Sequence, residues 1–122
     1  MHEGIVSPLP EGAVCNFTDV PGTFLASDSI NNIAVVITKS NNRLFVYRAI
    51  IDNDATNQQY TDGFVLWWSC VIPSKLLQQF RDTKSVSTVM YQELEGVIKL
   101  YIATGIYPVI EIRVDGTIPY GE

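Results

Sequence analysis

Histidine is almost absent from the sequence, and this limits the chemistry that the chain can perform. The 122 residues include one histidine, His2, which lies in a segment without hydrophobic periodicity. Histidine is the usual general base near neutral pH and the commonest metal ligand. A Ser-His or Cys-His nucleophile pair therefore lacks its base, and two cysteines make only half of a tetrahedral zinc site. We expect no catalytic residues, no metal site and no cofactor, and we predict that the chain is not an enzyme.

Clustered positive charge is also lacking. Lys and Arg total 8 against 13 Asp and Glu, which leaves a net charge of −5, and no two basic residues are adjacent. Because nucleic-acid binders neutralise phosphates with clustered Lys and Arg, we expect no nucleic-acid partner. No run approaches the roughly 20 apolar residues of a membrane span, so we expect no membrane insertion. Only 17% of the residues are charged, and a neutral surface favours a homo-oligomer.

Paired carboxylates could support glycosidase chemistry without histidine. The candidates are Asp52 with Asp54, and Glu93 with Glu95. Both pairs lie in polar stretches, and we interpret them as solvated loop residues. The stretch 52–63 begins like a calcium loop but lacks the central glycine and the closing glutamate. It is therefore not an EF-hand, and a looser calcium site there stays an alternative.

The two cysteines, Cys15 and Cys70, leave two alternatives open. They could form one disulfide, which would fit a secreted protein. They could also be two buried thiols, since free cysteine behaves as a small hydrophobic residue. We favour the buried thiols.

Short apolar runs separated by turn residues predict an all-β fold. Residues 1–12 have no periodic pattern and are interpreted as a lead-in or linker, and residues 13–122 as a single β domain. Turn signals about every eight to twelve residues are typical of an antiparallel sandwich or barrel. The predicted strands are residues 23–26, 33–39, 43–50, 64–72, 86–91, 97–103 and 109–114.

The runs 33–39 and 43–50 predict a hairpin around the polar residues 40–42. The first of these runs is apolar on both faces, which indicates burial on both sides of its sheet. Residues 27–32 are polar and predict a loop. The Asp-Gly pair that begins the segment 115–118 predicts a last hairpin.

Residues 74–82 are the single helical candidate in this β pattern. Ser74 is the predicted N-cap, and Leu76, Leu77 and Phe80 fall at helical spacing on one face. A helix this short is marginal alone, so it has to pack on a sheet.

The adjacent tryptophans Trp67 and Trp68 are the most unusual local feature. Successive side chains of a strand point to opposite faces, so one indole is expected in the core and the other on the opposite face. An exposed indole can stack on a sugar ring or fill a subunit interface. The alternative is that both faces are covered and both indoles are structural. Tyr60 and Asp62 lie on the long polar stretch before this strand, so we predict a ligand-binding site made of Trp67, Trp68, Tyr60 and Asp62.

The order of several motifs points to one family. The chain contains Asn16-Phe17-Thr18-Asp19-Val20-Pro21-Gly22-Thr23-Phe24, then an apolar run at 33–37, an aromatic run at 44–47 and Trp67-Trp68-Ser69. Over about residues 14–72 this order resembles the small knob domains of phage tail fibres and tail-like bacteriocins, which open with D-x-N-x-L-T-x-P-G-x-Y. Residues 110–118 are similar to the last hairpin of tail-fibre tips. The chain departs from the family in reading W-W-S where W-S-x-W is usual.

This resemblance implies a homotrimeric domain in the tail of a virion, assembled in the host cytoplasm, that binds a host cell-surface glycan or receptor. We therefore predict a receptor-binding or adhesion module that recognises a saccharide without catalysis. One alternative is a structural or assembly subunit of a virion or tail without its own ligand. Another is a secreted effector or lectin-like domain with a Cys15–Cys70 disulfide.

Overall fold

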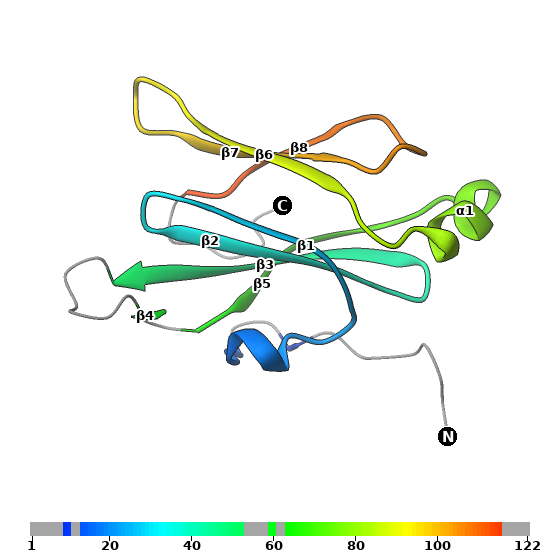
Figure 1. Cartoon of the computed structure of the whole chain (residues 1–122), viewed down its shortest axis with the longest axis horizontal. Coiled ribbons are helices and arrows are strands. Elements are labelled where there is room, and N and C mark those ends of the chain that lie inside the picture. The colour runs from blue at the N-terminus through cyan, green and yellow to red at the C-terminus, as the bar shows by residue number, and fades with distance from the viewer. Residues whose placement is uncertain (1–8, 11–12, 53–58, 61–62, 116–122) are drawn as a thin grey trace.

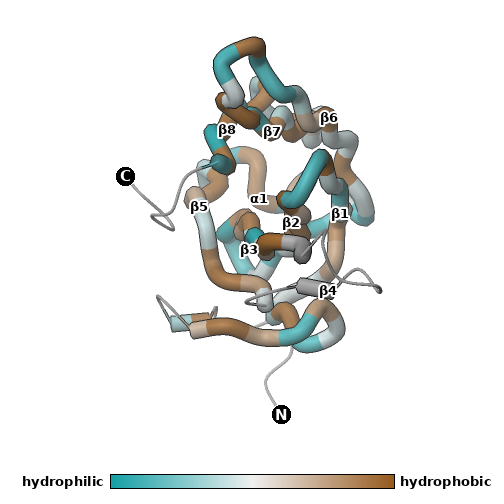
Figure 2. Tube along the Cα trace, turned by 90° about the vertical axis from the view of Figure 1, so that its left-hand side faces the viewer, coloured by the Kyte–Doolittle hydropathy of each residue, from teal (hydrophilic) through white to brown (hydrophobic). Residues whose placement is uncertain are grey.

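A computed structural model of the chain describes residues 9–10, 13–52, 59–60 and 63–115 (Figure 1). Within these residues the backbone forms two antiparallel sheets and one short helix, which confirms the predicted all-β fold. The smaller sheet lies over one face of the larger sheet, so the arrangement is sandwich-like (Figures 1 and 2). The predicted hairpin beyond Asp115 lies outside the described residues.

The larger sheet has the strand order β1-β2-β3, and both β4 and β5 pair with β3. Its strands are β1 (Thr23–Ile30), β2 (Ile33–Ser40), β3 (Arg43–Asp52), β4 (Gln59–Tyr60) and β5 (Val65–Val71). The smaller sheet has the order β6-β7-β8. Its strands are β6 (Ser87–Gln92), β7 (Ile98–Ala103) and β8 (Ile110–Arg113).

Strand β1 is longer than the sequence predicts. The expected loop at 27–32 is wrong, because β1 continues to Ile30 and pairs with β2 along that length. Only residues 31 and 32 form the turn, and Asn31 adopts a positive φ of 54° there. Asparagine tolerates this region better than most residues do. The segment looks like a loop in the sequence because Ser27 and Ser29 occupy the exposed positions of a strand at the sheet edge.

The hairpin of β2 and β3 matches the prediction and is covered on both faces, as the apolar pattern indicates. One face contributes Ile33, Val35, Ile37, Leu44 and Val46 to a cluster between the two sheets, which we call the upper core. The other face contributes Ala34, Val36, Phe45, Tyr47 and Ala49 to a second cluster, which we call the lower core.

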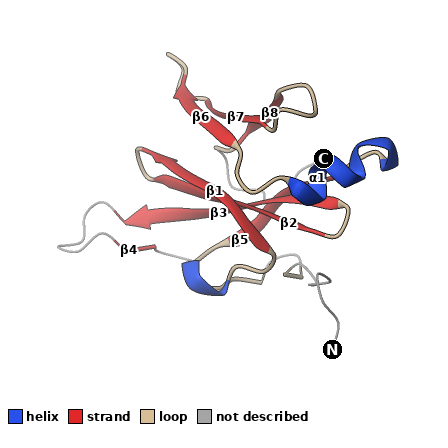
Figure 3. Cartoon of the chain, turned by 45° about the vertical axis from the view of Figure 1, so that its right-hand side comes forward, coloured by secondary structure: helices blue, strands red, loops and turns tan. Residues whose placement is uncertain are grey.

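The smaller sheet and the helix cover the upper core. Strands β7 and β8 supply Ile98, Leu100, Ile102, Ile110 and Ile112. The predicted helix at 74–82 is confirmed as a 3₁₀ turn, η2 (Ser74–Leu76), followed by α1 (Leu77–Asp82) at one end of the larger sheet (Figure 3). None of the helices in the described residues is long and apolar enough to span a membrane.

Packing holds this short helix in place. Phe80 is buried, and Leu76 and Leu77 pack against the upper core, as their spacing predicts. The prediction of Ser74 as N-cap is wrong, because no side-chain cap bond forms and the 3₁₀ turn already begins at this residue. At the other end, the Lys39 amine donates hydrogen bonds to the carbonyl oxygens of Phe80 and Arg81, at 2.8 and 2.9 Å. A lysine from β2 thereby adds hydrogen bonds to carbonyl oxygens in the last turn of the helix.

The segment before β1 covers the lower core. It contains a short 3₁₀ turn, η1 (Phe17–Asp19), which lies below the larger sheet in Figure 1. Cys15 and Phe64 exchange two backbone hydrogen bonds of 3.0 and 2.8 Å, which fasten the segment beside β5. Val20 and Cys15 then pack against the lower core.

The two cysteines lie on opposite faces of the larger sheet. Cys15 packs against the lower core and Cys70 against the upper core, and both are free thiols, each partly buried. Burial raises the pKa of both thiols. The alternative with a Cys15–Cys70 disulfide is contradicted, because the sheet separates the two side chains.

The turn into β1 depends on the absence of a side chain at Gly22, and this yields a test. Gly22 has φ +97°, and a Cβ there would lie 2.8 Å from Thr38 Oγ1 and 2.9 Å from the Lys39 carbonyl oxygen. Gly96 has a similar φ of +91° with open space around it. We predict that Gly22→Ala costs about 2–4 kcal/mol of unfolding free energy, against about 1 kcal/mol for Gly96→Ala. Urea denaturation measures both, and equal costs would contradict the close approach at Gly22.

Candidate ligand-binding site

The two adjacent tryptophans do not point to opposite faces as predicted. In the pairing of β3 with β5, Val46 lies opposite Trp68 and Tyr47 lies opposite Leu66, so Trp67 is an extra residue on its strand. Such a bulge interrupts the alternation of side chains. As a result Trp67 belongs to the upper core and Trp68 packs against the same core.

Trp67 is fixed inside the protein by polar contacts to the far side of the sandwich. Its side chain is 5% exposed, and its indole N–H donates to the Arg113 carbonyl oxygen at 2.9 Å. The Arg48 guanidinium lies over the ring, 3.7 Å from its centroid, and donates to the Val114 carbonyl oxygen at 2.7 Å. The pKa of Arg48 is lowered because the guanidinium is buried, and the negative charge of Asp115 offsets part of this effect. Trp67 therefore connects β5 to the end of β8 and has no free ring face to offer a ligand.

The other predicted site residues are not brought together among the described residues. Trp68 is partly exposed on the upper-core side. The backbone of Tyr60 pairs with Ile51, and its side chain is not described. Asp62, like residues 53–58 of the possible calcium loop at 52–63, lies outside the described residues. Ligand binding by these residues stays a prediction, with Trp68 as its described and accessible member.

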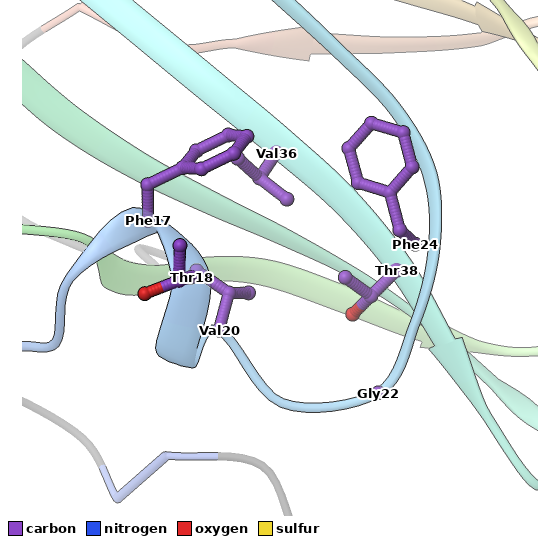
Figure 4. Close-up of a pocket in the computed structure, with 7 residues that line it drawn as sticks. All are labelled: Phe17, Thr18, Val20, Gly22, Phe24, Val36 and Thr38. Carbon is purple, nitrogen blue, oxygen red and sulfur yellow. The ribbon is translucent and has the colours of Figure 1, made fainter.

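A pocket lies instead on the lower-core side, where the segment before β1 passes over the sheet (Figure 4). Its volume is about 370 Å³, within the range of small-molecule sites. The lining combines the 3₁₀ turn, the Pro-Gly turn and the neighbouring strands β1 and β2. The residues that line it are Phe17, Thr18, Val20, Gly22, Phe24, Val36 and Thr38.

Two phenylalanine rings flank this pocket and β2 forms its floor. Phe17 is 42% exposed and Phe24 is 52% exposed, and Figure 4 shows them on opposite sides. The Phe17 ring is held by the Phe64 ring, with centroids 5.9 Å apart. Phe24 is the register partner of Thr38, so strand pairing places this ring beside the floor. Val36 and Thr38, both buried, complete the floor.

The Thr38 hydroxyl is an exception to ordinary packing. Thr38 is 1% exposed, and its Oγ1 has no hydrogen-bond partner among the described residues. Nearly all buried polar groups in native proteins are partnered, because an unpaired one costs the desolvation of that group. The atom itself is buried beneath the turn at Gly22, where a Cβ would lie 2.8 Å from it, so this cost falls on the folded chain.

The side chains that line the pocket are apolar or carry a hydroxyl. None of its side chains is a carboxylate, an imidazole, an amine or a thiol. Over the described ranges, no three His, Cys, Asp or Glu residues gather in a group that could hold a metal ion. The side chains that line the pocket therefore offer apolar contact and two hydroxyls, an exposed one on Thr18 and a buried one on Thr38.

Sequence reasoning missed this pocket although it singled out one of its walls. The segment from Asn16 to Phe24 was notable only as a motif that resembles a family opening. The sequence feature that could have indicated the pocket was the pair of aromatic residues on either side of a Pro-Gly turn. The floor gave no signal, because Val36 and Thr38 look like ordinary residues of a buried strand.

Comparisons with known proteins leave the function to be argued from this geometry. No protein-family model matches the chain, and neither the curated proteins nor the solved structures give a significant match. The resemblance to phage tail-tip knobs therefore stays a prediction.

The unpaired hydroxyl gives a direct test of the pocket floor. We predict that Thr38→Val raises the free energy of unfolding by about 1 kcal/mol, because it removes a buried polar group that has no partner. The matched control is Thr88→Val, since Thr88 Oγ1 donates to Asp28 Oδ2 at 2.9 Å. That control should lose about 1 kcal/mol. Urea denaturation measures the free energy of unfolding of both variants. A loss of stability in Thr38→Val similar to that of the control would show that the Thr38 hydroxyl is paired.

Proposed function

We propose that this chain is a non-catalytic receptor-binding or adhesion module that recognises a host cell-surface saccharide. The observation that carries the proposal is the pocket between the exposed rings of Phe17 and Phe24. Small-molecule sites are typically lined by apolar and aromatic side chains with a few placed polar groups. The apolar face of a sugar ring can stack on an aromatic ring while its hydroxyl groups stay in water at the pocket mouth.

The resemblance to phage tail-tip knobs supports the same function and adds a biological setting. The motif from Asn16 to Phe24, which carries that resemblance, is also the segment that builds one wall of the pocket. In this setting the chain acts as a homotrimer at the tip of a phage tail. It is assembled in the host cytoplasm and carried on the virion.

A second candidate function, that of a structural or assembly subunit, is favoured by the outer face of the smaller sheet. Val89 and Tyr91 of β6 are 60% and 53% exposed there. Leu94 in the turn after β6 and Val109 before β8 are exposed as well. Large exposed apolar side chains on one sheet are typical of surfaces that another protein covers.

A glycan array separates binding at the pocket from binding elsewhere. We predict that Phe24→Ala weakens saccharide binding about tenfold or more, because loss of an aromatic contact at a binding site costs about 1–2 kcal/mol. The matched control is Tyr91→Ala, since Tyr91 is 53% exposed and Phe24 is 52% exposed. The control should bind as the unchanged chain does. Equal binding by both variants would contradict a saccharide site at the pocket, and selective loss in Tyr91→Ala would move the site to the smaller sheet.

The proposed trimer has its own test. Light scattering coupled to chromatography should give three times the monomer mass for the unchanged chain, because the resemblance to tail-tip knobs implies a homotrimer and a low-charge surface favours association. A monomer at high protein concentration would contradict the trimer, and the array result would then stand alone as the test of ligand binding.

A further inference from the structure

We propose that copies of this chain associate through the outer face of the smaller sheet, so that a second copy covers the exposed apolar side chains there. The inference rests on the homotrimer in the proposed function and names the surface that builds it. The outer face is the side of β6, β7 and β8 that points away from the upper core, and none of the described elements lies over it (Figures 1 and 2).

Strand pairing gives this face an apolar centre. Val89 of β6 lies opposite Tyr101 of β7, and the exposed Ala103 follows two residues further along β7. Val109, immediately before β8, is exposed as well. The residues that alternate with them, Leu100 among them, fill the upper core, so the period of a strand turns this apolar set outward.

A row of charged groups borders the apolar centre. Tyr91, Lys99 and Arg113 lie side by side across the three strands. The Lys99 amine is 3.1 Å from the Glu93 carboxylate and 2.8 Å from the Glu111 carboxylate. An apolar centre with a polar rim is the usual anatomy of a protein–protein interface. Tyr91 belongs to the rim, where truncation of a side chain costs little, so Tyr91→Ala should keep the assembly.

The charges of the rim favour a second copy over a strongly acidic or basic partner. Lys99 and Arg113 are positive, and Glu93, Glu111 and Asp115, the partner of Arg113, are negative. Together these groups carry −1 of the net charge of −5, so two copies of this face repel each other little. A face with both signs is complementary to itself in a rotated orientation, because its positive groups can then meet the negative groups of the copy.

Association through this face leaves the pocket open. The smaller sheet lies on one side of the larger sheet, and the pocket lies on the other side, where η1 crosses β2 (Figure 1). Each copy in the assembly therefore keeps its pocket uncovered and directed away from the interface. Several pockets on one particle can bind several saccharides of one surface together, which raises the overall affinity without a new contact.

Matched lysine substitutions on the two sheets test this surface. We expect Val89→Lys and Val109→Lys each to raise the dissociation constant of the assembly about a hundredfold or more, because each would bury a charge without a partner. The matched control is Val71→Lys at the end of β5, since Val71 is 49% exposed against 60% for Val89 and 61% for Val109. The control should keep its mass. Light scattering over a concentration series measures the mass, and circular dichroism checks that each variant is folded.

The mass measurements decide the inference. An unchanged mass in both Val89→Lys and Val109→Lys, or an equal loss in Val71→Lys, would overturn it and leave a trimer built by another surface. A monomer for the unchanged chain would overturn the inference together with the trimer. A dimer that Val89→Lys dissociates would support the inference and overturn the trimer.

Saccharide binding is read separately, so the inference and the proposed ligand can fail apart. Val89→Lys should bind an array-selected saccharide in solution as the unchanged chain does, but should lose about tenfold or more on the array, where several sites act together. Equal loss in both measurements would contradict the separation of interface and pocket. Absence of saccharide binding by a chain that still assembles through this face would overturn the proposed ligand and leave the inference standing.

Discussion

The need to cover both faces of strand β2 shapes the rest of the molecule. Every residue of this strand except Lys39 is buried, so its sheet exposes apolar surface in two directions. A single layer cannot be stable with both faces in water, because burial of apolar area is the main favourable term in folding. The smaller sheet and helix α1 cover the upper core, and the segment before β1 covers the lower core. Each cover is made by a different part of the chain.

The pocket follows from the unequal size of these covers. On the upper side, three strands and a helix bury the sheet, and the buried Trp67 reaches the end of β8 through its indole N–H. On the lower side, a short segment crosses the sheet and ends at the Pro-Gly turn. The rings of Phe17 in this segment and of Phe24 in β1 stay partly exposed, while the floor beneath them is buried. The hydroxyl of Thr38, buried beneath the Gly22 turn without a partner among the described residues, costs stability.

The sequence predicted the parts of the fold that depend on local pattern. The hairpin of β2 and β3 and the helix at 74–82 each have a periodicity that matches their burial. Two expectations were wrong for physical reasons. The polar end of β1 looks like a loop because an edge strand can carry serine at its exposed positions, and the two tryptophans share a face because a bulge interrupts the alternation.

The candidate site could not be predicted from local sequence pattern. It depends on the register that places Phe24 opposite Thr38, and on the passage of the segment before β1 across Val36. Both are long-range features that a single sequence does not encode in any spacing. The predicted site, by contrast, relied on residue type alone, and one of its members, Trp67, is buried in the upper core.

The central claim is that the chain binds its ligand between Phe17 and Phe24. Amide chemical-shift mapping during titration with an array-selected saccharide tests it most directly. The account predicts that the largest shift changes fall on residues 17–24 and 36–38, on the lower side of the larger sheet. Changes confined to Trp68 and its neighbours, or to the outer face of β6 and β7, would contradict it.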